Sequence, residues 1–223
     1  MPVMLKKKFR RAVERIITVP DRVAVADYAT IDGFLSLREA ANLHRFARYV
    51  PENGLAVEIG SWQGKSTYCL AKGLRGGAKL IAIDPFDASG GADTASAQVY
   101  HDKAGDMPLA DIFRRNMKQR GVFERIEMWH GTSNVFVERI NKIGAIDLLF
   151  IDGDHSVEGA RFDFDHYAGL INVGGFVLLH DFDKNRLDLG PTWVVNERIR
   201  PSSDWAFVGL FDTLWVARRI AKA

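Results

Sequence analysis

The chain has 223 residues, of which 47% are hydrophobic and 26% are charged, and its formal net charge is +2. These values are typical of one globular domain with short additions, and they are not those of a disordered chain. The small net charge creates no strong overall field, so no nucleic-acid partner is expected.

The single cysteine, Cys69, excludes a disulfide framework and a cysteine-based zinc site. It stands among apolar residues of a helical stretch and is predicted to be a small core residue. No apolar stretch is long enough to span a bilayer, and the first residues lack the apolar core of a secretory signal. These features are typical of a cytoplasmic protein in a reducing compartment.

Residues 4–19 have the pattern of an amphipathic helix, with cations on one face and, on the other, Leu5, Phe9, Val13 and Ile16 or Ile17. We expect this helix to dock on its own core or on a second subunit, which would make the protein a homo-oligomer. The alternative is a weak contact of the basic helix with a membrane surface. Pro20 is expected to end the helix.

A second helix is predicted to begin at Ser36, because Ser36 and Glu39 have the spacing of a capping box. Residues 1–50 are predicted to form an N-terminal helical extension, and residues 51–223 the main domain.

From residue 55 the pattern alternates between strands and helices, which predicts right-handed crossovers and a mostly parallel sheet. The apolar runs 206–211 and 214–217 are joined tightly and predict an antiparallel hairpin at the sheet edge. The irregular stretch 85–105 follows a strand end and is predicted to be a lid, a substrate-binding wall or a disordered loop. Further strands are expected at about 55–60, 79–84, 126–130, 146–152 and 175–181, and helices near 65–74, 108–120, 134–143, 157–171 and 191–199.

The apolar run from Ile146 ends abruptly in Asp152 and Asp154, which predicts a central strand with acids at its carboxyl end. Ligands of open α/β sheets bind at that end of the strands. In the helix that follows, Asp163 is expected on the polar side, and Gly174-Gly175 is expected to turn the chain into the next strand.

The segment Val57-Glu58-Ile59-Gly60-Ser61-Trp62-Gln63-Gly64-Lys65-Ser66 has two glycines at a strand-to-helix turn. Its glycine spacing is one residue short of a P-loop, and Ser61-Trp62 replaces the middle glycine of the dinucleotide fingerprint. The pattern therefore favours a ligand without a phosphate at this turn. Downstream, Asp84 ends the next strand, where a carboxylate can accept both hydroxyls of a ribose.

Four motifs stand in order along the chain: Glu58-Ile-Gly60-Ser61-x-x-Gly64-Lys-Ser-Thr67, Asp84-Pro85, Phe150-Ile-Asp-Gly-Asp-His-Ser-Val-Glu-Gly159 and Gly174-Gly-Phe-Val-Leu-Leu-His180-Asp181. Together they resemble class I S-adenosylmethionine-dependent methyltransferases, in particular the small-molecule O-methyltransferase branch with an FIDGDHSxEG signature. The resemblance covers about residues 50–217. It implies a Rossmann-like, doubly wound, three-layer α/β/α fold with seven strands, one of them antiparallel, and makes 51–223 the methyltransferase domain.

The resemblance also implies that S-adenosylmethionine binds across the carboxyl ends of the strands. Asp84 would hold the ribose, and Asp152 would lie near the sulfonium methyl group. Thr132 or Ser133 would border the adenine. The methionine part would be surrounded by Glu58, Gly60, Ser61 and Gly64.

Carboxylates after two neighbouring strands would repel one another unless a cation or shared protons intervened. The resemblance to metal-dependent O-methyltransferases implies Mg²⁺ held by Asp152, Asp181 and Asp183, where it would lower the pKa of an acceptor hydroxyl. Phe182 separates two acids that are adjacent in such relatives, so a site without metal is the alternative. The candidates for the general base are Asp154, His155 and His180.

The implied function is methyl transfer to a hydroxyl group of a small molecule, such as a sugar, a polyketide or a phenol. Methylation of a macromolecule is one alternative, although the motif of base-flipping amino methyltransferases, Asn/Asp-Pro-Pro-Tyr, is absent. A non-catalytic nucleotide-binding protein is another, and the acids and histidines at the strand ends argue against it. The cations that would form an electrostatic arm for a macromolecule are Lys6, Lys7, Lys8, Arg10 and Arg11.

Overall fold

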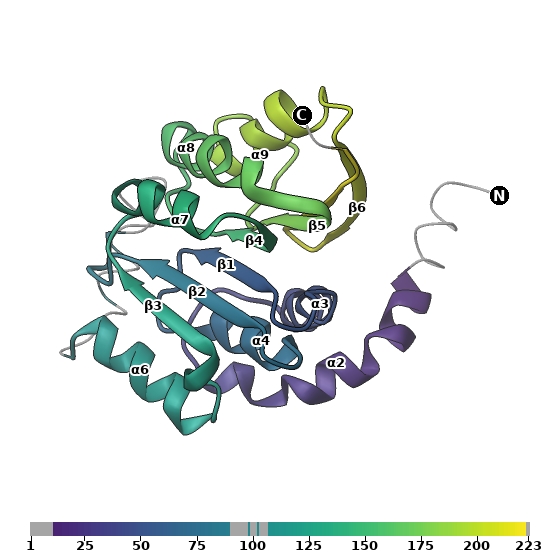
Figure 1. Ribbon diagram of the computed structural model, residues 1–223. Coiled ribbons are helices and arrows are strands. Elements are labelled where there is room, and N and C mark those ends of the chain that lie inside the picture. The colour runs from purple at the N-terminus through teal and green to yellow at the C-terminus, as the bar shows by residue number, and fades with distance from the viewer. Residues whose placement is uncertain (1–10, 90–97, 99–101, 103–106, 222–223) are drawn as a thin grey trace.

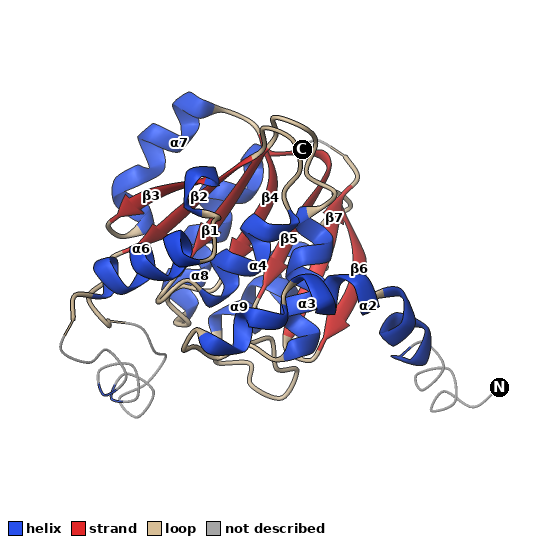
Figure 2. Cartoon of the chain, turned by 90° about the horizontal axis from the view of Figure 1, so that it is seen from below, coloured by secondary structure: helices blue, strands red, loops and turns tan. Residues whose placement is uncertain are grey.

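The computed structural model describes residues 11–89, 98, 102 and 107–221. The basic residues 6–10 and most of the predicted lid lie outside this part of the chain. The described residues form a seven-stranded sheet in the order β3-β2-β1-β4-β5-β7-β6, with helices on both faces (Figures 1 and 2). The strands are β1 (Leu55–Ile59), β2 (Lys79–Asp84), β3 (Ile126–His130), β4 (Ile146–Ile151), β5 (Ile171–Leu179), β6 (Trp205–Phe211) and β7 (Leu214–Arg219).

The helices form the two outer layers of the fold, which confirms the predicted three-layer α/β/α architecture. One face of the sheet is covered by α3, α4 and α6, and the other by α7, α8 and α9. The α-helices are α2 (Val19–Ala24), α3 (Leu37–Ala47), α4 (Lys65–Gly73), α6 (Leu109–Gln119), α7 (Val137–Ile143), α8 (Val157–Tyr167) and α9 (Gly190–Val194).

The central strands β1 and β4 are apolar except at Glu58 and Asp147, because both of their faces are covered. Ala56 and Leu148 point into the core beneath α3 and α4, whereas Val57 and Leu149 point into the opposite core. The run that ends in Asp152 is therefore a central strand, as predicted. β1 and β4 are parallel and in register up to Ile59 and Ile151, so the residues that follow them meet at one edge of the sheet.

Strand β5 begins earlier than predicted. Helix α8 ends at Tyr167, and the 3₁₀ turn η4 (Ala168–Leu170) leads directly into β5. The expectation that Gly174 and Gly175 precede the strand is wrong, because both lie within it. The register between β4 and β5 shifts there, and Gly174 has a φ of 93°, which together indicate a β-bulge.

The predicted terminal hairpin is present, and β7 is the antiparallel strand. It lies between β5 and the edge strand β6. The turn that joins β6 to β7 is held against α3, because the amide and the hydroxyl of Thr213 both donate hydrogen bonds to Oε1 of Glu39, at 2.9 and 2.8 Å. The hairpin turn is therefore held at the first turn of α3.

The N-terminal segment is helical on both sides of Pro20. Residues 11–17 are helical, Thr18 forms a turn, and α2 follows with Pro20 in its first turn. The first helix therefore ends before Pro20, whereas the second helix, with Pro20 in its first turn, was not predicted. Proline is tolerated in a first turn because the amide that it lacks has no partner within the helix there.

Two local predictions are confirmed. Helix α3 begins with the capping box, in which Ser36 and Glu39 exchange hydrogen bonds. Cys69 is fully buried in the core, and burial raises the pKa of its thiol.

Within the described ranges, no helix combines the length and apolarity needed to cross a bilayer.

Candidate active site

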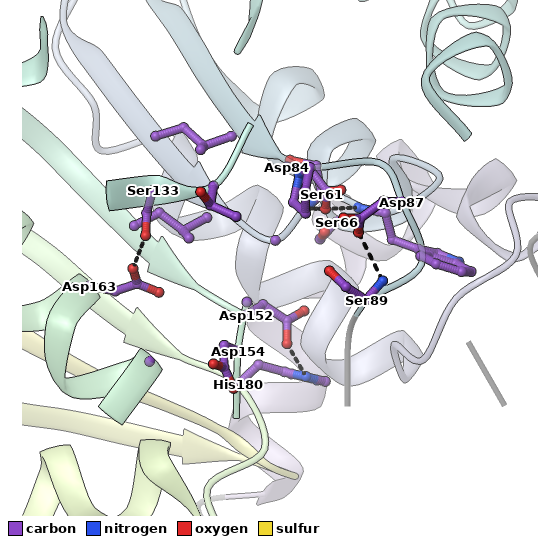
Figure 3. Close-up of a pocket in the computed structure, with 18 of the residues that line it drawn as sticks. Ser61, Ser66, Asp84, Asp87, Ser89, Ser133, Asp152, Asp154, Asp163 and His180 are labelled. Carbon is purple, nitrogen blue, oxygen red and sulfur yellow. Dashed lines mark hydrogen bonds and ion pairs between the residues drawn. The ribbon is translucent and has the colours of Figure 1, made fainter. Parts of the chain in front are cut away.

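A cavity of about 390 Å³ opens at the carboxyl ends of the parallel strands (Figure 3). It gathers side chains from after β1, β2, β3, β4 and β5, which are far apart in the sequence. Four predicted site residues, Glu58, Gly64, His155 and Asp183, are absent from its wall. The predicted residues that do line it are Gly60, Ser61, Asp84, Thr132, Ser133, Asp152, Asp154 and Asp181, together with His180.

The turn after β1 passes very close to the residue that follows β4. Gly60 has a φ of 89°, and a Cβ atom placed on it would lie 2.1 Å from the carbonyl oxygen of Asp152. Only glycine permits both the conformation and this approach. The turn therefore leaves a backbone-lined hollow where the first and fourth strands meet.

Asp84 ties this turn to the end of β2. Its Oδ2 accepts hydrogen bonds from the amides of Ser61 and Trp62, at 2.7 and 2.8 Å, and its Oδ1 accepts one from the amide of Phe86, at 2.6 Å. Burial raises the pKa of Asp84, although the three amide hydrogen bonds act in the opposite direction. Asp84 also lines the cavity, so its remaining lone pairs can accept ligand hydroxyl groups.

Glu58 supports the turn from behind and does not reach the cavity. Its Oε2 accepts hydrogen bonds from the hydroxyls of Ser61 and Thr67, at 3.0 and 2.5 Å. Complete burial raises its pKa to about 7, despite these hydroxyl contacts. Gly64 has a similar supporting position, because a Cβ atom on it would lie 2.5 Å from the terminal methyl of Met117.

The opposite end of the cavity is bordered by the loop after β3 and by α8. Ser133 donates a hydrogen bond of 2.5 Å to Oδ1 of Asp163, and both side chains line the cavity (Figure 3). Burial raises the pKa of Asp163 to about 7. The expectation that Asp163 lies on the polar side of its helix is wrong, because it is buried beside the cavity.

His180, which follows β5, lies between two carboxylates. Its Nδ1 is 3.0 Å from Oδ1 of Asp152, and its Nε2 is 3.5 Å from Oε2 of Glu39. Burial alone would lower the pKa of His180, but the charge and hydrogen bond of Asp152, with contacts from Asp181 and Glu39, raise it well above its ordinary value. These contacts favour the imidazolium form of His180.

The pKa values of the two carboxylates, Asp152 and Glu39, shift downward. Burial would raise the pKa of Asp152, but the charge of His180 and the contacts of both histidines lower it to about 2. In Glu39, burial is likewise outweighed by His180 and by the amides of Ser36 and Thr213, and the pKa falls to about 2. Glu39, His180 and Asp152 therefore form a row in which an imidazole lies between two carboxylates of opposite charge to it.

His155 occupies the other side of Asp152. Its Nε2 lies 3.5 Å from Oδ1 of Asp152 and 3.4 Å from Oδ2 of Asp181. Burial acts to lower the pKa of His155, but these two carboxylates raise it. Within the described residues its Nε2 is buried and has no hydrogen bond, so it can exchange a proton with Asp181 at the cavity wall.

The remaining candidate bases and ligands have local roles. Oδ1 of Asp154 accepts the amide of Ser156 and so helps to form the start of α8, although Asp154 also lines the cavity. Oδ1 of Asp183 accepts the amide of Asn185. Between them, Phe182 is buried, and its amide donates to the carbonyl of Thr213. Asp183 is consequently held in a turn beyond the cavity wall.

The donor set differs from the predicted magnesium site of Asp152, Asp181 and Asp183. Among the described residues, the acids and histidines whose ligand atoms lie within 4.8 Å of one another are Asp152, His155 and Asp181, and Asp183 is not in this group. Mg²⁺ favours carboxylates and water rather than imidazole. In addition, the imidazoles of His155 and His180 already pair with both carboxylates. Contacts with the imidazoles of His155 and His180 reduce the repulsion between these carboxylates.

Three cavity-lining residues other than glycine have a positive φ. Trp62, Ala88 and Asp181 have φ values of 47°, 62° and 56°. Each such conformation costs free energy and is typical of functional sites, where the surrounding structure holds it in place. These residues follow β1, β2 and β5, so the strained positions surround the cavity.

Sequence reasoning missed the roles of Glu39 and Asp163. Glu39 was identified only as part of a capping box, which gave no sign that its carboxylate also meets His180. Asp163 could have been recognised from its position next to Phe164 on the buried side of α8. An acid beside an apolar helix face, in the helix that follows a strand-end motif, indicates a side chain directed toward the site.

Fold and site together define a doubly wound α/β protein whose cavity lies where the strand order reverses, between β1 and β4. Residues 57–182 match the methyltransferase domain family. The chain belongs to this family, which confirms the resemblance found in its sequence motifs.

Solved structures share the fold. A candidate O-methyltransferase from Klebsiella pneumoniae superposes with a TM-score of 0.65 at 16% identity, covering 94% of this chain and 97% of that one. The O-methyltransferase TomG from Streptomyces achromogenes, involved in tomaymycin synthesis and solved with S-adenosylmethionine, gives 0.63 at 17% identity, covering 92% and 89%. An O-methyltransferase from Bacillus cereus, solved with S-adenosylhomocysteine, gives 0.62 at 16% identity, covering 92% and 90%.

One curated relative is the uncharacterized protein R132 of Acanthamoeba polyphaga mimivirus. It is 25% identical over 130 residues, which is 58% of this chain and 52% of that protein. The chain therefore spans about half the length of the curated relative that it matches.

Proposed function

We propose that the protein transfers the methyl group of S-adenosylmethionine to a hydroxyl group of a small molecule. The observation that carries this proposal is the convergence of the Gly60 turn, Asp84 and Asp152 on one cavity. Family membership and the fold shared with O-methyltransferases support it. The cavity volume of about 390 Å³ lies in the range of small-ligand sites.

The cavity wall suggests how the cofactor lies. Asp84 would accept the ribose hydroxyls, and the backbone around Gly60 and Ser61 would face the methionine part. The Ser133–Asp163 pair lies at the other end, where a hydroxyl and a carboxyl can recognise the adenine. This arrangement directs the sulfonium toward Asp152, at the junction of the first and fourth strands.

For this reaction the protein must mainly align the cofactor with the acceptor and remove one proton from the acceptor hydroxyl. When bound, S-adenosylmethionine supplies the methyl group, whose bond to sulfur breaks as the bond to the acceptor oxygen forms. The paired carboxylate of Asp181 lines the cavity and would accept the hydrogen bond of the acceptor hydroxyl. His155, 3.4 Å behind it, would receive the proton.

His180 has a different part in this proposal. Its contacts with Asp152 and Glu39 raise its pKa well above the ordinary value, which favours the imidazolium and disfavours a role as the general base. It would act as a positioning residue that fixes the Asp152 carboxylate. No step requires a metal ion, because His180 pairs with Asp152, and His155 in its neutral form can take up the proton of the acceptor.

The test is transfer of labelled methyl from S-adenosylmethionine to a panel of hydroxylated sugars, phenols and polyketides, with Mg²⁺ and with a chelator. We expect at least one acceptor to be methylated, to a similar extent in both conditions. Asp181→Asn and His155→Gln should each lower the rate about 100-fold or more. The matched control, Asp183→Asn, should stay near wild type. Equal rates in all three variants would contradict the assignment of the base.

A further inference from the structure

The helical segment of residues 11–24, which includes α2, presents an apolar face to the outside of the molecule. Ile16 and Val23 are 72% and 71% exposed, and Val19 is 53% exposed. In a helix these three residues lie on one side, together with the exposed Ala12. Such a stripe normally faces the core of a surface helix, so its outward direction here requires an explanation.

The polar residues of the same segment hold it to the body of the protein. Glu14 forms an ion pair of 2.5 Å with Arg38 of α3, and Asp21 is buried against His44, at 2.7 Å, and Arg48, at 3.2 Å. These contacts fix the rotation of the helix. The apolar stripe is consequently directed away from the core by specific ion pairs and is not a frayed end.

The exposed charges along the flank of the stripe are positive. They belong to Arg11, which also lies 3.8 Å from the carboxylate of Asp212, and to Arg15. The two acids of the segment, Glu14 and Asp21, face inward in the ion pairs described above. Four further cations, Lys6, Lys7, Lys8 and Arg10, precede the segment in the sequence. An apolar stripe with flanking cations is the pattern of a helix that lies in the plane of an anionic membrane surface.

The position of the segment suits a flat partner. Figures 1 and 2 show it running along the outside of α3 and leaving the body of the molecule at its N-terminal end. A second copy of the chain fits the charges less well. In a twofold helix pair, the arginine flank of one helix would meet the same flank of the other, and like charges oppose such an interface.

We propose that residues 11–24 are a membrane-docking helix that places Ile16, Val19 and Val23 among the acyl chains of an anionic lipid surface, with the arginines at the phosphate level. The contact is peripheral, and it is separate from the methyl-transfer site. It holds whether or not the proposed reaction is correct, since its test needs no substrate.

The test is co-sedimentation of the full chain with vesicles of phosphatidylcholine alone and with about 30% phosphatidylserine. We expect binding to the anionic vesicles and a loss of affinity of about tenfold or more in Ile16→Glu and in Val23→Glu. Arg15→Glu should weaken binding and reduce its dependence on salt. The matched control is Ile143→Glu, which places the same charge on an exposed residue of α7, at the other end of the molecule.

Unchanged thermal unfolding and S-adenosylhomocysteine binding would show that the variants are folded. Three results would overturn the proposal. One is the absence of vesicle binding by the wild type. Another is binding that Arg15→Glu weakens but Ile16→Glu and Val23→Glu do not, because charge alone would then be responsible. The third is a wild-type dimer in sedimentation velocity that Ile16→Glu dissociates, which would make a second copy the occupant.

Discussion

The carboxylate of Glu39 lies 3.5 Å from Nε2 of His180, and this contact joins the first turn of α3 to the end of β5. The other oxygen of Glu39 holds the hairpin turn at Thr213. One buried acid thus positions a helix, a hairpin and the imidazole that contacts Asp152.

Glu39→Gln should lower the pKa of His180, because a neutral amide no longer stabilises the imidazolium. It should also reduce the free energy of unfolding by about 1 to 3 kcal/mol, since a buried charged hydrogen bond is lost. The ring titration of His180, followed by NMR, and denaturant unfolding would measure the two effects. Ser36→Ala is the control. It weakens the same cap by about 1 kcal/mol and should leave the titration of His180 unchanged.

Gly60→Ala should be far more harmful than a glycine replacement at a comparable backbone conformation elsewhere. Its Cβ atom would lie 2.1 Å from the carbonyl oxygen of Asp152, which is backbone and cannot move aside. The matched variant is Gly121→Ala, where φ is 66° and no atom lies within 4 Å of the new Cβ. Gly121→Ala should cost about 1 to 2 kcal/mol from conformation alone. Equal losses in thermal unfolding would contradict the close approach of the two strand ends.

Asp84→Asn should weaken S-adenosylhomocysteine binding about tenfold or more. The amide removes a charged acceptor for the ribose hydroxyls, and it points an N–H group at one of the backbone amides that the carboxylate now accepts. Asp87→Asn provides the comparison, because Asp87 also lines the cavity but is exposed and accepts only the amide of Ser89 among the hydrogen bonds identified for it. Calorimetry should separate the two variants clearly.

The stability of the protein should fall as the pH rises through neutrality, partly because of Glu58. Its pKa is 4.5 ordinarily and about 7 in the folded chain. An acid whose pKa is raised by folding binds its proton more tightly when folded. The stability that it contributes is therefore fully present below about pH 4.5 and is lost as the pH passes through about 7.

Glu58→Gln should remove that part of the pH dependence, which amounts to about 3 kcal/mol at most. The glutamine carbonyl can still accept the hydroxyls of Ser61 and Thr67. Denaturant unfolding at pH 5 and pH 8 would measure the difference, with the exposed Glu138→Gln as a control. A wild-type protein and a Glu58→Gln variant with parallel stability curves would contradict a neutral Glu58 in the fold.

The order of strands and helices follows from local patterns that the sequence displays directly. The run ending in Asp152 is apolar because both faces of β4 are covered, and the periodicity of the helices records which side is buried. The pair Gly174-Gly175 was misinterpreted, and the helix that begins at Val19 was missed, because a glycine pair and a proline are each compatible with two structures. A proline can end a helix or stand in its first turn, and a glycine pair can form a turn or a bulge.

The site was only partly predictable. Strand-end residues such as Asp84 and Asp152 are visible because parallel strands place their ends at one edge. The pairing of Glu39 with His180 depends on how α3 and the hairpin pack, and no local pattern encodes it. Asp183 illustrates the converse. It has the right residue type beside the site, but burial of Phe182 holds it in a neighbouring turn.

The central claim is that the turn at Gly60, the Asp84 carboxylate and the end of β4 form one pocket for an adenosyl thioether. Calorimetric titration with S-adenosylhomocysteine, and with NAD and ATP as comparators, tests it most directly. We predict binding of S-adenosylhomocysteine at micromolar concentrations, in the presence or absence of Mg²⁺, and no detectable binding of either comparator. Binding of NAD or ATP without binding of S-adenosylhomocysteine would contradict the account.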